Sequence, residues 1–335
     1  MHITGIGINA DGRRGNFCLA HASEDLSYFQ RCGFDAVEVP VHHLDVLVGG
    51  RLRRQDVDRV RATIEPFDFA YTVHAPERLN LAHPQKGSRG QVEIRLEQDV
   101  FVACLDFCAA IGAQVMVYHS GLIALHSVAF GLEDIPDEEE LEQAREREVS
   151  ALKVLLPLAM ERGVVVAMEN RDPHPWEIAT LVRAGIPPDQ LLRYHAGMVI
   201  PNLIRQIEDV NHPSLGLTLD YGHLFLAAHH CGFDYLSAVH QAAPYVRHLH
   251  ASGNCGRLGG VFDGLRTRIP YGDGDLHMPP GWGTIPQEET LTQLPDYEGI
   301  CVLEIRSRFW QHFPDAQQTM RRMLQRVVAR QQRTG

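Results

Sequence analysis

Lysine and cysteine are both scarce in this sequence, and each scarcity argues against a class of chemistry. The 335 residues contain two lysines, Lys86 and Lys153, in segments that we predict as loop or helix surface, which disfavours a lysine Schiff base in a pocket. The seven cysteines are odd in number and have no C-x-x-C spacing, which argues against a disulfide framework and a thiolate zinc site. We expect them to be buried and reduced.

Long apolar runs and an excess of basic residues are also missing. No run approaches the roughly 20 residues of a membrane helix, and no signal-peptide pattern is present, so we expect a cytoplasmic protein without membrane contact. The net charge of −11 leaves no general basic surface, so nucleic-acid binding would need a local cationic groove. We expect a small sugar-like substrate instead, and we leave a homo-oligomer open.

Eight short apolar runs alternate with segments of helical periodicity. The runs cover residues 2–9, 36–41, 69–73, 114–118, 164–168, 215–220, 246–249 and 300–303. The helical segments cover residues 23–33, 53–64, 89–112, 133–163, 201–210, 224–243 and 315–330. This order predicts an α/β protein with a single (β/α)8 TIM-barrel domain over residues 1–335, with long βα loops at its C-terminal face. The acidic run 133–148 predicts a solvated helix face.

Polar residues occupy the predicted C-terminal strand ends, the face where such barrels hold their chemistry. These residues are His74, His119, Glu169, Asp220, His250 and Glu304. A single histidine at a strand end is usually structural, but six acids and imidazoles at one mouth would cost several kcal/mol each if buried unpaired. A bound cation would neutralise them, so we predict a metal site.

Seven motifs in order resemble the xylose isomerase-like TIM-barrel superfamily. They are VHAPERLNLAHP (73–84), YHSG (118–121), MEN (168–170), LDYGH (219–223), HLH (248–250), DLHMPPGWGTI (275–285) and LEI (303–305). That superfamily includes sugar and sugar-phosphate isomerases and epimerases, and AP endonucleases of the endonuclease IV type. The resemblance covers nearly the whole chain.

The resemblance implies a metal site shared by both branches and held by Glu169, Asp220, His250 and Glu304. In the endonuclease-like arrangement, His74 and His119 join Glu169 on a second ion, and a third is held by His223, Asp275 and His277. Imidazoles and carboxylates without thiolates suit Zn²⁺, Mn²⁺ or Fe²⁺, so we expect one to three divalent ions. We interpret five further histidines, His43, His83, His229, His230 and His248, as supporting or surface residues.

Two enzyme mechanisms fit these residues. In an isomerase or epimerase of a small sugar, sugar phosphate or related polyol, a metal stabilises an enediolate while Glu169 and Glu304 act as paired acid and base. In a phosphoester hydrolase resembling endonuclease IV, several metals activate a bridging water. We favour the isomerase, because Glu77 replaces an aromatic DNA contact and the loop 41–50 lacks basic and aromatic ones. A metal-binding barrel without catalysis is the third alternative.

Substrate contacts are expected on the same rim. We name Arg171, Arg257 and Trp282 as substrate-binding candidates, and expect one arginine among Arg171, Arg193, Arg257, Arg266 and Arg268 to face the pocket and bind a phosphate or carboxylate. The third metal group can close only if the glycine-rich loop, residues 252–283, folds back over the barrel mouth. Gly281 and Gly283 provide the backbone freedom for this fold-back.

Overall fold

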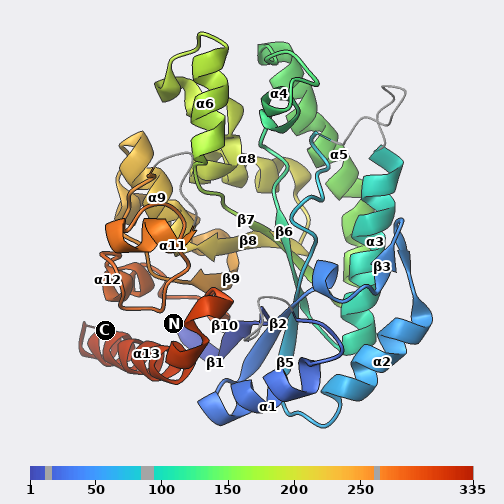
Figure 1. Cartoon of the computed structure of the whole chain (residues 1–335), viewed down its shortest axis with the longest axis vertical. Coiled ribbons are helices and arrows are strands. Elements are labelled where there is room, and N and C mark those ends of the chain that lie inside the picture. The colour runs from blue at the N-terminus through green and yellow to red at the C-terminus, as the bar shows by residue number, and fades with distance from the viewer. Residues whose placement is uncertain (12–16, 84–93, 260–264, 335) are drawn as a thin grey trace.

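The computed structural model describes residues 1–11, 17–83, 94–259 and 265–334. Eight parallel strands close into a barrel in the order β1-β10-β9-β8-β7-β6-β5-β2 (Figure 1), which confirms the predicted architecture. In chain order these strands are β1 (His2–Asn9), β2 (Ala36–Pro40), β5 (Ala70–His74), β6 (Val115–His119), β7 (Val165–Glu169), β8 (Leu215–Asp220), β9 (Val246–Ala251) and β10 (Glu298–Leu303). All the predicted strands are present, with ends shifted by at most two residues.

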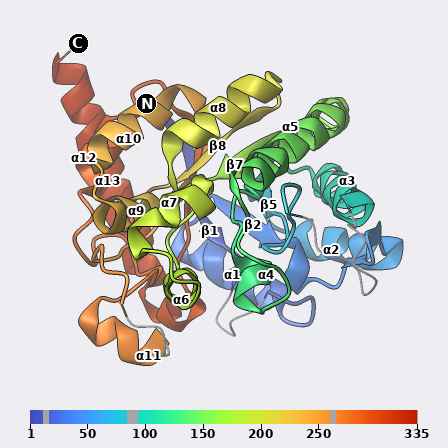
Figure 2. The ribbon, with the colours of Figure 1, turned by 90° about the horizontal axis from the view of Figure 1, so that it is seen from above.

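Helices surround the barrel, as Figure 2 shows from above. They are α1 (Ala22–Cys32), α2 (Arg54–Ile64), α3 (Ile94–Ile111), α4 (His126–Ala129), α5 (Glu138–Glu161), α6 (Pro175–Arg183), α7 (Leu191–Tyr194), α8 (Ile200–Val210), α9 (Tyr221–Cys231), α10 (Tyr235–Ala242), α11 (Leu265–Arg268), α12 (Gln287–Thr292) and α13 (Phe313–Thr334). The 3-10 helices are η1 (Val41–His43), η2 (Pro188–Gln190), η3 (Ala196–Met198), η4 (Ala243–Tyr245), η5 (Ile269–Tyr271) and η6 (Ser307–His312). Local signals set several ends: Gly33 terminates α1 in the left-handed conformation, and Asp137 with Glu140 forms a capping box on α5.

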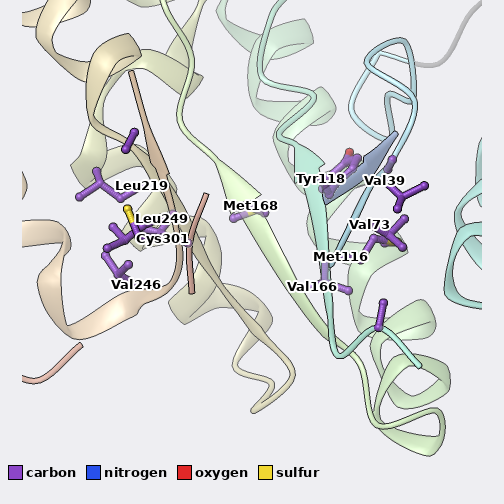
Figure 3. Close-up of a cluster of buried hydrophobic side chains, with 14 of the residues drawn as sticks. Val39, Val73, Met116, Tyr118, Val166, Met168, Leu219, Val246, Leu249 and Cys301 are labelled. Atoms are coloured by element: carbon purple, nitrogen blue, oxygen red, sulfur yellow. The ribbon is translucent and has the colours of Figure 1, made fainter. Parts of the chain in front are cut away.

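Each predicted strand-end ligand follows a fully buried residue of the apolar layer. These preceding residues are Val73, Tyr118, Met168, Leu219, Leu249 and Leu303. The ring of Tyr118 lies 5.6 Å from that of Phe101 on α3, so this residue faces the helices. Because successive strand side chains point to opposite faces, burying this layer directs the following acid or imidazole toward the barrel interior. Figure 3 labels five of the preceding residues within the buried cluster.

The structure differs from the sequence prediction in two places. A small hairpin, β3 (Leu47–Val48) and β4 (Arg51–Leu52), was not predicted because its strands are too short to show a period. The solvated face predicted for 133–148 is wrong for Glu148, which is buried and accepts hydrogen bonds from Tyr118 Oη at 2.5 Å and Gln206 Nε2 at 2.6 Å. The predicted beginning of the third helix near Arg89, like Lys86, lies outside the described residues.

All seven cysteines are free thiols; four are buried and Cys18, Cys231 and Cys255 are half-buried. The predicted burial of the thiols is confirmed for four of them, and their reduced state stays a prediction. In the described segments, every helix is too short or too polar to cross a bilayer.

Candidate metal centre

Glu169, at the end of β7, is fully buried and lies among four imidazoles. Its Oε2 is 2.9 Å from His119 Nε2 and 3.5 Å from His74 Nε2. Its Oε1 is 3.1 Å from His250 Nδ1 and 3.4 Å from His223 Nδ1. The two oxygens of one carboxylate therefore face two different halves of the histidine cluster.

Glu304 follows β10 and approaches the same histidine from another side. Its Oε2 lies 3.2 Å from His250 Nδ1 and 3.6 Å from His277 Nδ1. Asp220 completes the group from the end of β8, with Oδ2 4.0 Å from His250 Nδ1. Glu169, Asp220, His250 and Glu304 each offer a ligand atom within 4.8 Å of the others, which is the set predicted for the shared metal site.

The glycine-rich loop is docked over this end of the barrel. Gly253 and Met278 exchange backbone hydrogen bonds of 2.7 and 3.0 Å, and the Thr284 amide donates to Asn254 at 2.9 Å. Gly283 has a φ of +88°, and a Cβ there would lie 2.1 Å from the Asn254 carbonyl oxygen. The docking therefore requires glycine at Gly283, because a side chain would collide with the backbone it packs against.

Docking of this loop brings Asp275 and His277 to the cluster. His277 adopts a positive φ of 42° and contacts Asp275 through Nε2, while its Nδ1 donates to the Glu304 carbonyl at 3.0 Å. Asp275 Oδ1 lies 3.9 Å from His223 Nε2. A non-glycine residue in this conformation is strained, which is common at functional sites. The nine residues predicted as ligands thus lie together. Eight of them belong to three overlapping groups whose candidate ligand atoms lie within 4.8 Å of one another. The ninth, Asp275, contacts His223 and His277 from these groups.

Glu38 belongs to this site and was missed by the sequence analysis. It lies inside the buried strand β2, where its Oε1 is 2.9 Å from His250 Nε2 and its Oε2 is 2.9 Å from His248 Nε2. Thr72 also donates to Oε2, at 3.0 Å. A carboxylate that holds one ring nitrogen of a histidine orients the other toward a metal. The available signal was an acid within an otherwise apolar strand.

Burial and neighbouring charges shift the pKa values of the cluster in opposite directions. Burial is the largest single influence on His74 and His277 and lowers the pKa of each. Glu169, Glu38 and Glu304 together outweigh it at His74, and Asp275 and Glu304 together outweigh it at His277, so each pKa is raised to about 9. Burial raises the pKa of Asp220 to about 7. At His119, burial and the Arg171 guanidinium lower the pKa to about 3, so this imidazole is neutral.

The cluster fits a divalent cation. Four of its buried carboxylate oxygens accept no hydrogen bond from any described residue: Glu169 Oε2, Asp220 Oδ2, Asp275 Oδ1 and Glu304 Oε2. Leaving such groups unsatisfied is costly, and a cation would compensate for it. The donors are imidazole nitrogens and carboxylate oxygens, which suit Zn²⁺, Mn²⁺ or Fe²⁺.

The residues proposed to contact substrate lie in different surroundings. Arg171 contacts His119 Nδ1 and lines a large groove beside the centre. Arg257 is exposed and pairs with Asp273 at 3.0 Å, and the Trp282 ring packs 4.9 Å from His312. Of the other arginines considered, Arg193 pairs with Glu138, Arg268 does not line the groove, and the side chain of Arg266 lies outside the described part.

A second histidine and carboxylate cluster, also missed, lies in the long loop after β7. Glu177 Oε2 is 3.0 Å from both His174 Nδ1 and His195 Nδ1, and it accepts the His174 amide at 3.0 Å. The last contact belongs to a capping box on α6. This cluster therefore joins the start of α6 to the segment around His195. The distance of eighteen residues between Glu177 and His195 left no local signal.

Known proteins resemble this chain in sequence pattern and in fold. The family model described as "Xylose isomerase-like TIM barrel" matches residues 26–326. A D-tagatose 3-epimerase-like protein is 17% identical with a TM-score of 0.68, over 98% of this chain and 99% of that one. IolI with a bound zinc atom is 17% identical with a TM-score of 0.63, over 98% of this chain and 99% of that one. The E. coli 3-keto-D-glucoside 4-epimerase YcjR is 17% identical with a TM-score of 0.62, over 94% of this chain and 98% of that one. At these identities the likeness establishes the fold alone, and no curated protein matches the sequence.

Proposed function

Because the chain belongs to the xylose isomerase-like TIM-barrel family, we propose that it is a divalent-metal-dependent isomerase or epimerase of a small sugar, sugar phosphate or related polyol. The observation that carries this proposal is the position of two carboxylates around one imidazole nitrogen. Glu169 and Glu304 lie 3.1 and 3.2 Å from His250 Nδ1, and they come from different strands of the barrel.

The ion would be held first by Glu169, Asp220, His250 and Glu304. A divalent ion bound there supplies a Lewis acid for adjacent oxygens of a keto sugar. His74, His119, His223, Asp275 and His277 are available for further ions or for hydrogen bonds to substrate hydroxyls. The docked loop keeps Asp275 and His277 beside this set.

Glu169 and Glu304 are the proposed proton carriers. One carboxylate removes the proton from the carbon beside the carbonyl, and the other returns a proton to the opposite face or to the adjacent carbon. Their environments differ, because the side chain of Glu169 is 0% exposed and that of Glu304 is 19% exposed. Glu304 can therefore exchange its proton with water, whereas Glu169 is sealed inside the barrel.

The printed names of structural neighbours support the same reaction class. Those proteins include a D-tagatose 3-epimerase-like protein and a 3-keto-D-glucoside 4-epimerase, and both align over nearly their whole length. The arrangement of the site supports a substrate with adjacent oxygens for the cation and an acidic C–H bond that can lie between the two carboxylates.

A multinuclear phosphoester hydrolase is the second candidate, favoured by the docked loop that joins His277 to Glu304. The residues near the mouth weigh against a nucleic-acid substrate. Glu77 lines the groove beside the centre, and burial lowers the pKa of His42 to about 4, so this imidazole of the loop 41–50 is uncharged at neutral pH. A carboxylate near a phosphate backbone repels it.

One experiment separates these candidates. The metal-loaded protein is incubated with an abasic-site duplex and, separately, with a panel of keto sugars and their phosphates. We expect a change of sugar configuration or carbonyl position, and an intact duplex. Strand cleavage that disappears in His277→Ala would transfer the proposal to the hydrolase, and metal binding without either reaction would support the non-catalytic alternative.

A further inference from the structure

A large groove adjoins the metal centre on the rim of the barrel, and we call it the rim groove. It encloses about 1430 Å³ between the segments that follow β5, β6 and β7. Its walls include residues 77–83, residues 123–147 and residues 171–183. Figures 1 and 2 show α4 and α6 from two of these segments next to each other above the barrel. The groove exceeds the roughly 300–1,000 Å³ typical of small-molecule pockets, so it is larger than one sugar ring requires.

Arg171 connects the rim groove to the metal centre. The side chain lines the groove and contacts Nδ1 of His119, whose Nε2 lies 2.9 Å from Glu169. The Arg171 backbone is fixed by a hydrogen bond of 3.0 Å from its amide to the Gly197 carbonyl. Arg171 is therefore the residue at which the rim groove and the metal centre meet.

The charges of the rim groove nearly cancel. Four arginines line it, Arg78, Arg147, Arg171 and Arg183, together with four carboxylates, Glu77, Glu133, Asp134 and Glu140. Burial and Arg147 lower the pKa of His83 to about 4, so this imidazole adds no charge at neutral pH. A groove for a polyanion carries an excess of cations, so the balance here favours a neutral, polar ligand.

A row of aromatic rings forms one wall of the rim groove. The ring centroids of His126 lie 5.3 Å from Phe130 and 5.9 Å from Trp176, and Trp176 lies 5.6 Å from His174. Phe130 is 71% exposed, and Leu132 beside it is 77% exposed. Exposed apolar side chains grouped in a polar groove mark a binding surface. Flat rings suit a ligand that has one apolar face and many hydroxyls, as a sugar ring does.

The aromatic wall is held in place before any ligand binds. Glu177 lies 3.0 Å from the imidazoles of His174 and His195, and α6 begins there with Trp176 in its first turn. Arg183 at the other end of α6 donates to the Ala129 carbonyl at 3.2 Å, which joins α6 to α4. A preformed wall loses little entropy when it binds a ligand.

We propose that the rim groove binds a second, glycosidically linked neutral sugar ring, so that the substrate of the metal centre is a glycoside or oligosaccharide rather than a free monosaccharide. The sugar at the reducing or non-reducing end enters the cluster while its neighbour stacks on Trp176 and Phe130. This inference rests on the proposed isomerase or epimerase function for turnover, but binding in the groove is measurable without turnover.

The first test measures binding to the metal-loaded protein by calorimetry. The probes are glucose, glucose 6-phosphate, and the disaccharides maltose, cellobiose and lactose. We expect at least one disaccharide to bind roughly tenfold more tightly than glucose, and Trp176→Ala to remove this gain. Tyr271→Ala is the control for loss of an aromatic ring, because Tyr271 is an exposed aromatic residue, 68%, outside the groove, whereas Trp176 is half-buried. Tighter binding of glucose 6-phosphate than of any disaccharide would overturn the proposal. An equal loss of disaccharide affinity in Tyr271→Ala would overturn it as well.

The second test separates failure of this inference from failure of the proposed function. Turnover is compared for keto monosaccharides and the matching keto disaccharides with the wild type, Phe130→Ala and Trp176→Ala. We expect the variants to lose about tenfold in kcat/KM for the disaccharide and to stay within twofold for the monosaccharide. Equal kcat/KM for both substrates in the wild type would reject the second sugar site in the rim groove and leave the proposed isomerase function standing. Disaccharide binding that depends on Trp176, without turnover of any sugar, would support the sugar site in the rim groove and reject the proposed isomerase function.

Discussion

Glu38 holds His250 from inside the barrel, with its Oε1 2.9 Å from the Nε2 of the imidazole. The opposite nitrogen, Nδ1, faces Glu169 and Glu304. The tautomer that donates to Glu38 leaves the lone pair of His250 directed at the centre. Glu38 therefore determines which nitrogen of His250 is available to a metal.

Glu38→Gln should weaken metal binding by about ten- to a hundredfold, because a neutral amide orients His250 less strongly and makes it a poorer donor. Titration against a chromophoric chelator measures this change. Thr72→Val is the matched control, since it removes the 3.0 Å hydrogen bond to Glu38 but leaves the contact with His250. Equal affinities in wild type and Glu38→Gln would show that Glu38 only fills the barrel interior.

Glu169→Gln and Glu304→Gln should each lower kcat by about 10²- to 10⁴-fold at saturating metal, because each removes a proton carrier. Assays over a series of metal concentrations separate this effect from weaker metal binding. Circular dichroism checks that the fold persists. Glu148→Gln changes a buried carboxylate outside the ligand groups and should keep its turnover. Full activity of either of the first two variants would remove that residue from the mechanism.

Gly283→Ala should undock the glycine-rich loop and reduce bound metal to the level of His277→Ala. Its new Cβ would meet the Asn254 carbonyl oxygen at 2.1 Å. Gly281→Ala is a close control, because its φ of +87° is nearly the same as the +88° of Gly283, but its Cβ would have 3.4 Å to its nearest neighbour. Elemental analysis of the purified variants gives the metal content. A Gly283→Ala protein with wild-type metal content would show that docking is not needed for binding.

The stability of the metal-free protein should fall as the pH rises from 6.5 to about 9. Folding raises the pKa of His74 and His277 from 6.5 to about 9, so their contribution is full below pH 6.5 and is lost as the pH rises through the folded values. A bound metal displaces these protons, so metal affinity should rise over the same range. Urea unfolding of chelator-treated and metal-loaded protein measures both trends. A metal-free protein whose stability is flat or rises across this window would contradict these shifts.

The sequence predicts the ends of the strands well, and the reason is local. His74, His119 and Glu169 each follow an apolar run whose burial requires a strand, and the alternation of side chains then directs them inward. The same argument predicts Asp220 and His250. Their mutual arrangement follows because parallel strands in a barrel all end at one face.

Residues whose roles depend on distant contacts were not predictable in this way. Glu38 gains its role from His250, which is far away in the sequence, and Glu177 gains its role from His195. Glu148 looked like part of a charged surface because it belongs to an acidic run, whereas its own position on α5 faces Tyr118. In each case tertiary packing, rather than periodicity, decides where the carboxylate points.

The central claim is that Glu169 and Glu304 move a proton on a sugar carbon, and isotope exchange tests it most directly. The metal-loaded protein is incubated in deuterated water with the sugars of the panel, and the products are analysed by NMR and mass spectrometry. We predict deuterium at one carbon beside the carbonyl, introduced through the partly exposed Glu304, and no incorporation with Glu304→Gln. A sugar that changes configuration in the wild type without acquiring solvent deuterium, or exchange that persists in Glu304→Gln, would contradict the account.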